Sequence, residues 1–364
     1  MVHDQQARKV LVTPLDWGLG HATRSIPVIH ELQNRKCEVV IATSGDALLL
    51  LRTEFPTLQF FELPAYRARY STRIPFMTGI LLQMPKFLWA IRKEHVQTQR
   101  IIREQKIDFV ISDSRFGCWS TRVPTIFISH QTTILMPSHL KWLESAINFF
   151  NRQQIKKFTQ CWIPDFPSDR VTDKLTSVAG LNIRFIGMLS RFKKPKILTQ
   201  VKYNYLILIS GPEPQRTILE QFMRKNIHVL PGKKMIVKGQ PHLGQEIIQT
   251  KGFDEVGHLQ AGTLQHIIES SEMIIARSGY STVMDLAALG KKAFFIPTPG
   301  QTEQELLALE LEKRKIAYYQ NQKDLDLIRA NEEMENYTGF SNFDQPESLL
   351  SKTMDEFLIS LPNA

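Results

Sequence analysis

Short apolar runs of strand length alternate along the chain with longer segments whose apolar residues recur at helical spacing. Such runs are typical of buried parallel strands, because helices on both faces of a sheet leave no polar side. In order, the runs are Val10–Val12, Val39–Ala42, Phe109–Ser112, Thr125–Ile128, Tyr205–Ile209, Met235–Val237 and Ala293–Ile296. The alternation predicts an α/β fold with two doubly wound, Rossmann-like domains.

A polar, basic, proline-containing segment from Ser190 to Lys196 separates the two series of strands. We therefore predict an N-terminal domain over 1–190, a linker over 191–200 and a C-terminal domain over 201–345. Apolar residues at helical spacing predict one further helix within 346–364.

Composition and charge narrow the class of protein. The chain has 364 residues, 43% of them hydrophobic and 22% charged, which is ordinary for a globular protein of two domains. Its three cysteines, Cys37, Cys118 and Cys161, are too widely spaced for a disulfide framework or a zinc cluster. No signal peptide or membrane-spanning run is evident, so we expect a cytoplasmic protein that is soluble or peripheral.

Polar residues gather where the predicted strands of the first half end. A glycine loop, Gly18-x-Gly20-His21, follows the first strand, and it is too short of glycines for a dinucleotide fingerprint. Asp113 and Arg115 follow the third strand, and His130 follows the fourth. Because ligands bind beyond the carboxyl ends of parallel strands, His21, Asp113, Arg115 and His130 are candidates. The alternative is a loop hydrogen-bond partner for His21, and loop or helix capping for the other three.

The stretch from Ala276 to Glu305 is the most informative. It predicts a turn at Ser278 and Gly279, a helix from about Ser281 to Gly290, a buried strand, and a capping box formed by Thr302 and Glu305. Helix N-termini behind small-residue loops suit phosphate, and Asp285 suits paired sugar hydroxyls. Alternatively, Asp285 is a solvated helix residue and Glu305 only caps a helix.

This stretch resembles the nucleotide-sugar-binding segment of GT-B glycosyltransferases, in the family of the peptidoglycan GlcNAc transferase and the plant galactolipid synthases. The resemblance implies a cleft between the domains, Arg277, Ser278 and Gly279 near the donor phosphates, Asp285 on the ribose and Gln304-Glu305 on the sugar. This chain departs from the family pattern at Asp285, where the peptidoglycan enzyme has Glu, and at Glu305, where the family has Gln. The resemblance also places Gly18, Gly20, Ser210 and Gly211 at the donor and returns the C-terminal helix to the first domain.

By the same resemblance, we expect an inverting, metal-independent transfer from a nucleoside-diphosphate sugar such as UDP-GlcNAc, without a cofactor. His21, or else Asp113, would act as the base, because the attacking hydroxyl must lose a proton. Arg115 or His130 would meet an anionic acceptor, which could be lipid-linked or a glycan. The alternatives are a nucleotide-sugar hydrolase or 2-epimerase on the same fold, and a non-catalytic protein that binds nucleotide sugars or nucleic acid.

The surface charge is uneven, since residues 1–195 carry a formal charge of +12 and residues 196–364 carry −3. Within the first half, a basic run lies beside an apolar one over residues 66–93. Paired signals of this kind suit peripheral contact with the inner face of a membrane. A buried helix with an exposed basic loop is the alternative. We find no RNA-binding aromatic motif and expect no nucleic-acid partner.

Overall fold

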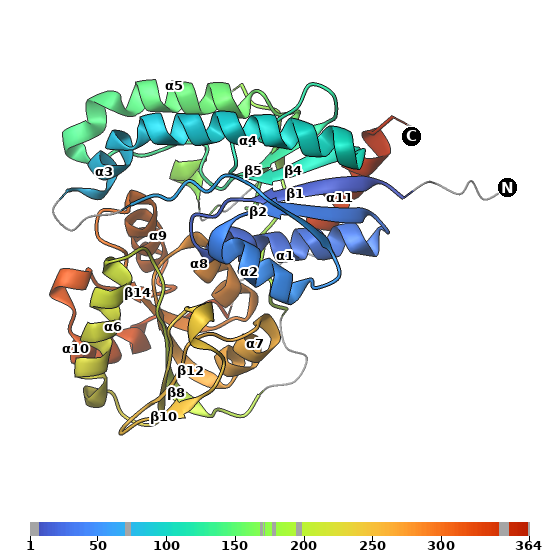
Figure 1. Cartoon of the computed structure of the whole chain (residues 1–364). Coiled ribbons are helices and arrows are strands. Elements are labelled where there is room, and N and C mark those ends of the chain that lie inside the picture. Colours follow the sequence, from blue (N-terminus) through green and yellow to red (C-terminus); the bar gives the residue numbers. More distant parts are fainter. Residues whose placement is uncertain are drawn as a thin grey trace. The chain divides into compact units, whose positions relative to one another are not determined.

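The computed structural model divides the chain into two compact units (Figure 1). Unit 1 comprises residues 1–68, 83–189 and 345–364, and unit 2 comprises 69–82 and 190–344. The structure describes residues 7–69, 74–167, 170, 172–176, 180–193, 199–341 and 349–362. Residues 194–198 of the predicted linker and 70–73 of the predicted membrane segment lie outside these ranges.

Unit 1 is built on a parallel sheet in the order β3-β2-β1-β4-β5-β6-β7. Its strands are β1 (Lys9–Pro14), β2 (Glu38–Thr43), β3 (Gln59–Glu62), β4 (Phe109–Asp113), β5 (Thr125–Ile128), β6 (Gln160–Ile163) and β7 (Ile183–Phe185). Its helices are α1 (Leu19–Asn34), α2 (Gly45–Glu54), α4 (Met84–Gln105), α5 (Glu144–Ile155) and α11 (Leu349–Ser360), with 3-10 turns η1 (Ser138–Leu143) and η2 (Asp173–Leu175).

Alternate residues of each strand pack on opposite faces of this sheet. Val10 and Val12 belong to a core shared with α1, α2 and α11, whereas Leu11 between them packs with Ile101 and Ile102 of α4. Figure 1 shows α1, α2 and α11 on one side of these strands and α4 on the other. The predicted C-terminal helix, α11, thus lies in the core of unit 1.

Unit 2 has a sheet in the order β10-β11-β9-β8-β12-β13-β14, parallel except for the pairing of β10 with β11. Its strands are β8 (Tyr203–Leu208), β9 (Lys234–Val237), β10 (Ile248–Gln249), β11 (Asp254–Val256), β12 (Ser271–Ala276), β13 (Lys292–Phe295) and β14 (Tyr318–Tyr319). Its helices are α3 (Phe76–Leu82), α6 (Gln215–Asn226), α7 (Ala261–Glu269), α8 (Tyr280–Ala288), α9 (Thr302–Lys313) and α10 (Leu327–Glu333), with 3-10 turns η3 (Ile227–Val229), η4 (Pro241–Leu243), η5 (Gln322–Asp324) and η6 (Met334–Asn336).

The prediction for the helix after residue 280 is confirmed. α8 is followed by Gly290, whose φ of +65° is the left-handed conformation that favours glycine, and the chain then enters β13.

Both sheets are doubly wound, and strand order reverses where β1 meets β4 and where β8 meets β12. Loops that follow these strands meet at the reversal, which is where such sheets bind ligands.

Candidate functional site

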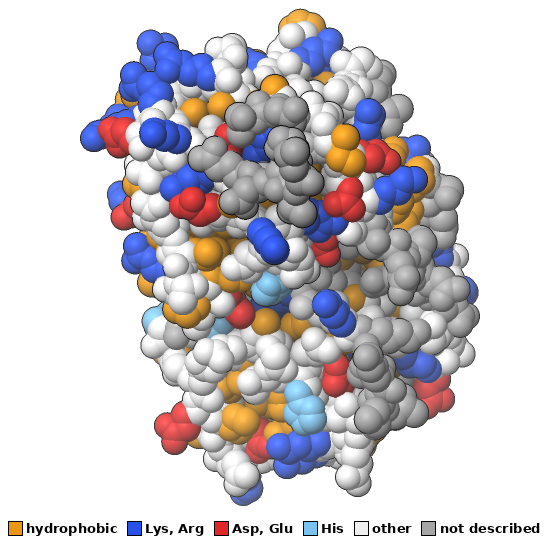
Figure 2. Space-filling view, turned by 90° about the vertical axis from the view of Figure 1, so that its right-hand side faces the viewer, with side chains coloured by type: hydrophobic (Ala, Val, Ile, Leu, Met, Phe, Trp, Pro, Cys, Tyr) orange, Lys and Arg blue, Asp and Glu red, His pale blue; other side chains and the backbone are white. Residues whose placement is uncertain are grey.

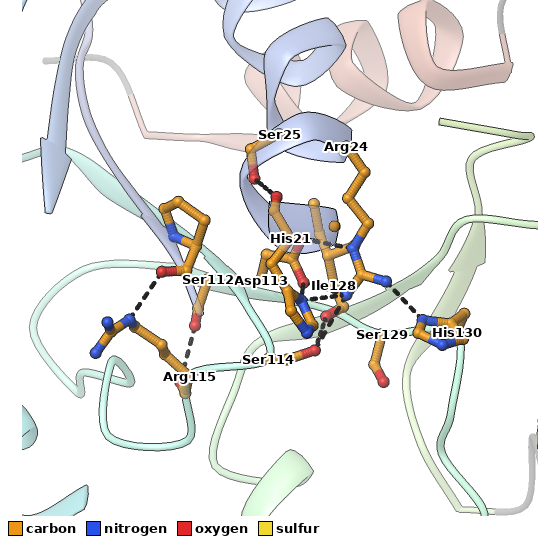
Figure 3. A network of polar contacts seen from close by, with 12 residues as sticks. His21, Arg24, Ser25, Ser112, Asp113, Ser114, Arg115, Ile128, Ser129 and His130 are labelled. Carbon is orange, nitrogen blue, oxygen red and sulfur yellow. Dashed lines mark hydrogen bonds and ion pairs between the residues drawn. The ribbon is translucent and has the colours of Figure 1, made fainter. Parts of the chain in front are cut away.

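In unit 1, the reversal of strand order brings His21 and Asp113 together (Figure 3). Pro14 of β1 pairs in register with Asp113, the last residue of β4. After β1 the chain turns at Gly18, with φ of +86°, and His21 falls in the first turn of α1. Its Nδ1 lies 2.9 Å from Oδ1 of Asp113. The two residues predicted as alternative bases therefore form one pair.

Arg24, which sequence reasoning missed, is the centre of this cluster. Its side chain is buried, and Nε donates to Oδ2 of Asp113 at 2.6 Å while Nη2 donates to Oδ1. Nη1 donates to Nδ1 of His130 at 2.6 Å. A signal for Arg24 was present in the sequence, because residues three apart lie on one face of a helix and His21 precedes it by three.

Within this cluster, the pKa values of Asp113 and His21 are both lowered, which leaves the two side chains in different states of charge. Burial would raise the pKa of Asp113, but the charge of Arg24 and the hydrogen bonds from Arg24 and His21 outweigh it and hold that pKa well below its usual range. Burial, and next the charge of Arg24, lower the pKa of His21, against the opposing effect of Asp113. Around neutral pH, Asp113 is thus an engaged carboxylate and His21 an uncharged imidazole that can accept a proton.

Arg115, predicted to meet an anionic acceptor, is instead occupied within unit 1. Its side chain is 0% exposed, and its donors serve two carboxylates, a hydroxyl and two backbone carbonyls. The acceptors are Pro14 O (2.8 Å), Pro64 O (3.1 Å), Glu94 Oε1 (2.6 Å), Asp16 Oδ1 (3.2 Å) and Ser44 Oγ (2.9 Å). An acceptor anion would have to displace one of these partners, so we interpret Arg115 as a residue that ties loops together.

In unit 2, three loops that follow neighbouring strands converge. Gly211 lies in the loop after β8, Arg277 follows β12 and Thr298 follows β13. Gly211 is exposed, with φ of +107°, and a Cβ built on it would lie 3.4 Å from Thr298 Oγ1 and 3.7 Å from Arg277 Nε. Ser210 precedes Gly211 in the same loop. The residues predicted to lie near phosphate in the loops after β8 and β12 are therefore close together.

The guanidinium of Arg277 is buried without a carboxylate partner among the described residues. Its Nη atoms donate to neutral acceptors only: Ile296 O and Pro297 O at 3.1 Å, Gln215 O at 2.9 Å and Gln322 Oε1 at 2.5 Å. Nε has no partner, and neither has the buried hydroxyl of Thr298. Burial lowers the pKa of Arg277 to about 10. A buried cation with an unused donor costs free energy, so this position favours a ligand of opposite charge.

Ser278 and Gln304 hold the loop that carries Thr298. Oγ of Ser278 donates to the carbonyl of Gln304 at 2.8 Å, and Oε1 of Gln304 accepts from the backbone N–H of Thr298 at 2.9 Å. Gly279, the N-cap of α8, packs against the amide of Gln304. The two predicted helix starts are therefore linked directly.

The predicted capping box of α9 is wrong, because the N-cap lies one residue earlier in the chain. The N-cap is Gln301 and not Thr302, which is already the first helical residue. Glu305 reaches past the cap and accepts from the N–H of Gly300 at 2.9 Å. The proline-glycine loop bends back over the helix start, so the partner of Glu305 is a loop amide that the S/T-x-x-E spacing does not indicate.

Asp285, predicted to bind the ribose, is buried on α8 and contacts the start of unit 2. Oδ1 accepts from Oγ of Ser190 at 2.7 Å, and Oδ2 lies 3.4 Å from Nε of Arg191. Burial raises the pKa of Asp285, and the two neighbours oppose this shift. Asp285 is therefore not a solvated helix residue, because its carboxylate is buried and already accepts a hydrogen bond from the hydroxyl of Ser190.

Comparison with known proteins supports the predicted family. Residues 200–348 match the glycosyltransferase family 28 C-terminal domain. The chain is 21% identical, over 84% of each sequence, to the UDP-N-acetylglucosamine–N-acetylmuramyl-(pentapeptide) pyrophosphoryl-undecaprenol N-acetylglucosamine transferase of Clostridium botulinum strain Langeland. These matches support the predicted assignment to the GT-B glycosyltransferases, with a family 28 type of C-terminal domain over residues 200–348. The predicted enzyme class, sugar transfer from a nucleotide sugar, is confirmed.

Solved structures agree on the fold of this glycosyltransferase. Acinetobacter baumannii MurG superposes with a TM-score of 0.60 at 14% identity, covering 96% of this chain and 99% of its own. The spinosyn rhamnosyltransferase SpnG complexed with thymidine diphosphate gives a TM-score of 0.60 at 13% identity, covering 98% and 97%. These likenesses confirm the predicted two-domain, Rossmann-like architecture.

Proposed function

We propose that this glycosyltransferase takes a UDP-sugar and holds its diphosphate beside Gly211. The observation that carries the proposal is the buried Arg277, whose Nε is unpaired and faces, together with the unpaired hydroxyl of Thr298, the empty Cβ position of an exposed glycine. A phosphate oxygen at that position would accept from both groups. It would also give the guanidinium of Arg277 an anionic partner.

The helix that begins beside this position strengthens the argument. α6 starts at Gln215, whose carbonyl accepts from Nη2 of Arg277, so the N-terminus of a 12-residue helix lies over the guanidinium. Its first N–H groups and its dipole favour an anion. The diphosphate is also the leaving group, and developing charge on it would be stabilised here without a metal. We infer that the reaction is metal-independent and uses no cofactor besides the donor substrate.

Two single-atom changes test the diphosphate position. Thr298→Val removes the hydroxyl and keeps the shape, and Gly211→Ala places a methyl group where the phosphate oxygen would lie. We expect both variants to lose most of the thermal stabilisation that UDP-sugars give the wild type in a panel of UDP-, GDP- and dTDP-sugars. Gly252→Ala is the control for left-handed strain, because Gly252 also has φ of +107° but no heavy atom lies within 4 Å of its Cβ position. If Gly211→Ala and Gly252→Ala bind alike, the diphosphate lies elsewhere.

The same panel tests the ribose contact. In the proposed complex, Asp285 exchanges the hydroxyl of Ser190 for ribose hydroxyls, and Gln304 and Glu305 face the donor sugar. Asp285→Ala should then lose the response to every nucleotide sugar. A mutant that responds as the wild type does, or a wild type that no nucleotide sugar stabilises, contradicts the donor assignment.

For the chemical step, we propose an inverting displacement in which His21 accepts the proton of the acceptor hydroxyl. Both carboxylate oxygens of Asp113 are engaged by Arg24, so Asp113 orients His21 and is not itself the base. His21→Gln should abolish transfer but not donor binding. Release of free sugar into water without any acceptor would instead favour a hydrolase.

We further propose a lipid-linked acceptor, because the relative's name gives a pyrophosphoryl-undecaprenol acceptor for that enzyme. We propose that this chain reaches it by peripheral contact with the inner face of a membrane. Large apolar side chains are exposed on unit 1: Trp89 (60%) on α4, Trp142 (77%) in η1 and Phe149 (63%) on α5. Lys93 lies 3.7 Å from the ring of Trp89. Among the described residues no helix is long and apolar enough to cross a bilayer.

Vesicle sedimentation tests this contact. Trp89→Ser and Trp142→Ser should each weaken binding to vesicles that contain phosphatidylglycerol, whereas Val201→Ser, at an apolar site in unit 2 that is 56% exposed, should not. Equal binding by all three variants would remove the proposed surface. Figure 2 shows Lys and Arg side chains interspersed with Asp and Glu on the face in view, with no continuous basic track over its described part. That distribution does not suggest a nucleic-acid partner.

A further inference from the structure

Arg24 contacts four polar side chains of unit 1, which lie on α1, at the end of β4 and beyond β5 (Figure 3). It holds both oxygens of Asp113 at the end of β4, and it donates to His130 beyond β5. Its Nη2 also lies 2.8 Å from Nδ1 of His21 and 3.2 Å from Oγ of Ser114. The side chain of Arg24 is 2% exposed, so its forked guanidinium is held inside the protein.

The contact with His130 determines where that ring carries its proton. A guanidinium has five donors and no acceptor, so Nδ1 of His130 must offer a lone pair at 2.6 Å from Nη1. The ring proton of His130 is then on Nε2. While this hydrogen bond exists, His130 is an uncharged donor and not a cation.

For His21 the geometry gives the opposite tautomer. Its Nδ1 lies 2.9 Å from Oδ1 of Asp113, and an ionised carboxylate can only accept, so a proton on Nδ1 makes this contact favourable. Nη2 of Arg24, 2.8 Å from the same Nδ1, can also only donate and by itself would favour a lone pair there. Its two protons have other acceptors in Oδ1 of Asp113 and Oγ of Ser114, so the carboxylate decides the tautomer of His21. Nε2 of His21 is left with a lone pair.

We propose that Arg24 is a positioning residue that sets complementary roles on two neutral histidines, His21 accepting at Nε2 and His130 donating at Nε2. The inference rests on the proposed base role of His21 and extends it to the side chains that hold this base in place. Burial, and next the charge of Arg24, lower the pKa of His21 against the opposing effect of Asp113, so the charge of Arg24 also favours the unprotonated ring.

Nitrogen NMR of histidine-labelled protein tests the inference without donor or acceptor. Two-bond correlations distinguish a proton on Nδ1 from one on Nε2, and His21→Gln and His130→Gln assign the two rings. In the wild type we expect His21 protonated on Nδ1 and His130 on Nε2. In Arg24→Met the fixed tautomer of His130 should be lost, and the titration midpoint of His21 should rise, as expected when a nearby cation is removed.

Two further variants keep the test decisive. Arg24→Lys retains the charge and loses the fork, so it should leave the midpoint of His21 near the wild-type value while releasing the tautomer of His130. Arg35→Met removes another arginine–carboxylate contact at the far end of α1, with Glu31 and Asp355, and should change neither ring. A wild-type His21 protonated on Nε2, or an Arg24→Lys protein whose His130 keeps its tautomer, overturns the inference.

Kinetics separate this inference from the proposed function. Arg24→Lys should lower kcat by about 10²-fold or more, with the KM for the donor unchanged, because a misdirected base slows only the proton transfer. If His21→Gln is inactive while the tautomers do not depend on Arg24, only the role of Arg24 fails. If the tautomers are as expected but His21→Gln keeps full activity, the proposed base fails and the arrangement around Arg24 stands.

Discussion

Replacing Phe357 by alanine would remove a ring from the middle of the unit 1 core. Phe357 lies on α11 and is 3% exposed, with its ring 5.3 Å from that of Phe109 and 5.9 Å from that of Trp162, edge-on to both. Truncating a buried phenylalanine costs about 3–5 kcal/mol, and two edge-to-face contacts place this site in the upper part of that range. With a urea dependence of about 2 kcal/mol/M, the unfolding midpoint should fall by roughly 2 M.

Tryptophan fluorescence in urea measures this change in unit 1 alone. All five tryptophans lie in that unit: Trp17, Trp89, Trp119, Trp142 and Trp162. Ile359→Ala is the matched control, because Ile359 is 84% exposed on the same helix and should change stability by no more than about 0.5 kcal/mol. If the two variants unfold at the same urea concentration, α11 does not belong to the cooperative core of unit 1, and the reasoning is refuted.

Three other changes have defined outcomes. Because the pKa of His21 is lowered from its ordinary 6.5, its base form persists below that pH, and kcat/KM should decline only on the acid side of 6.5; a midpoint above 6.5 in a pH–rate profile contradicts the assignment. Glu94→Gln removes the carboxylate nearest to the buried Arg115 and should lower the free energy of unfolding of unit 1 by about 3–5 kcal/mol in the same fluorescence assay. An unchanged free energy of unfolding would show that this ion pair does not stabilise the unit. Ser190→Ala removes the hydroxyl that occupies Asp285, so the KM for the donor should fall roughly 3- to 10-fold; an unchanged KM shows that the ribose does not compete with Ser190.

The repeating order of elements could be predicted because it depends on local patterns. Continuous apolar runs such as Val10–Val12 became parallel strands covered on both faces, and Gly290 ended α8 as its left-handed conformation requires. The meeting of His21 with Asp113, 92 residues apart, follows from the rule that ligand loops gather where strand order reverses.

The roles of individual side chains were harder to predict, because they depend on partners distant in sequence. Arg115 looked available for an anion, yet its acceptors come from four separate segments of unit 1. Thr298 carried no signal at all, since its importance lies in having no partner in a buried position. Arg24 could have been found from its spacing to His21, but only the structure shows that both residues reach the same carboxylate.

The position of α11 in the sequence has a consequence for how the protein is made. The chain emerges from the ribosome N-terminus first, so the whole of unit 2 is synthesised before Leu350, Met354 and Phe357 become available to the sheet of unit 1. Until then, one apolar face of the nascent sheet of unit 1 lacks part of its cover. We expect the later-made unit to complete its folding first, and the earlier-made unit to need chaperone protection during translation.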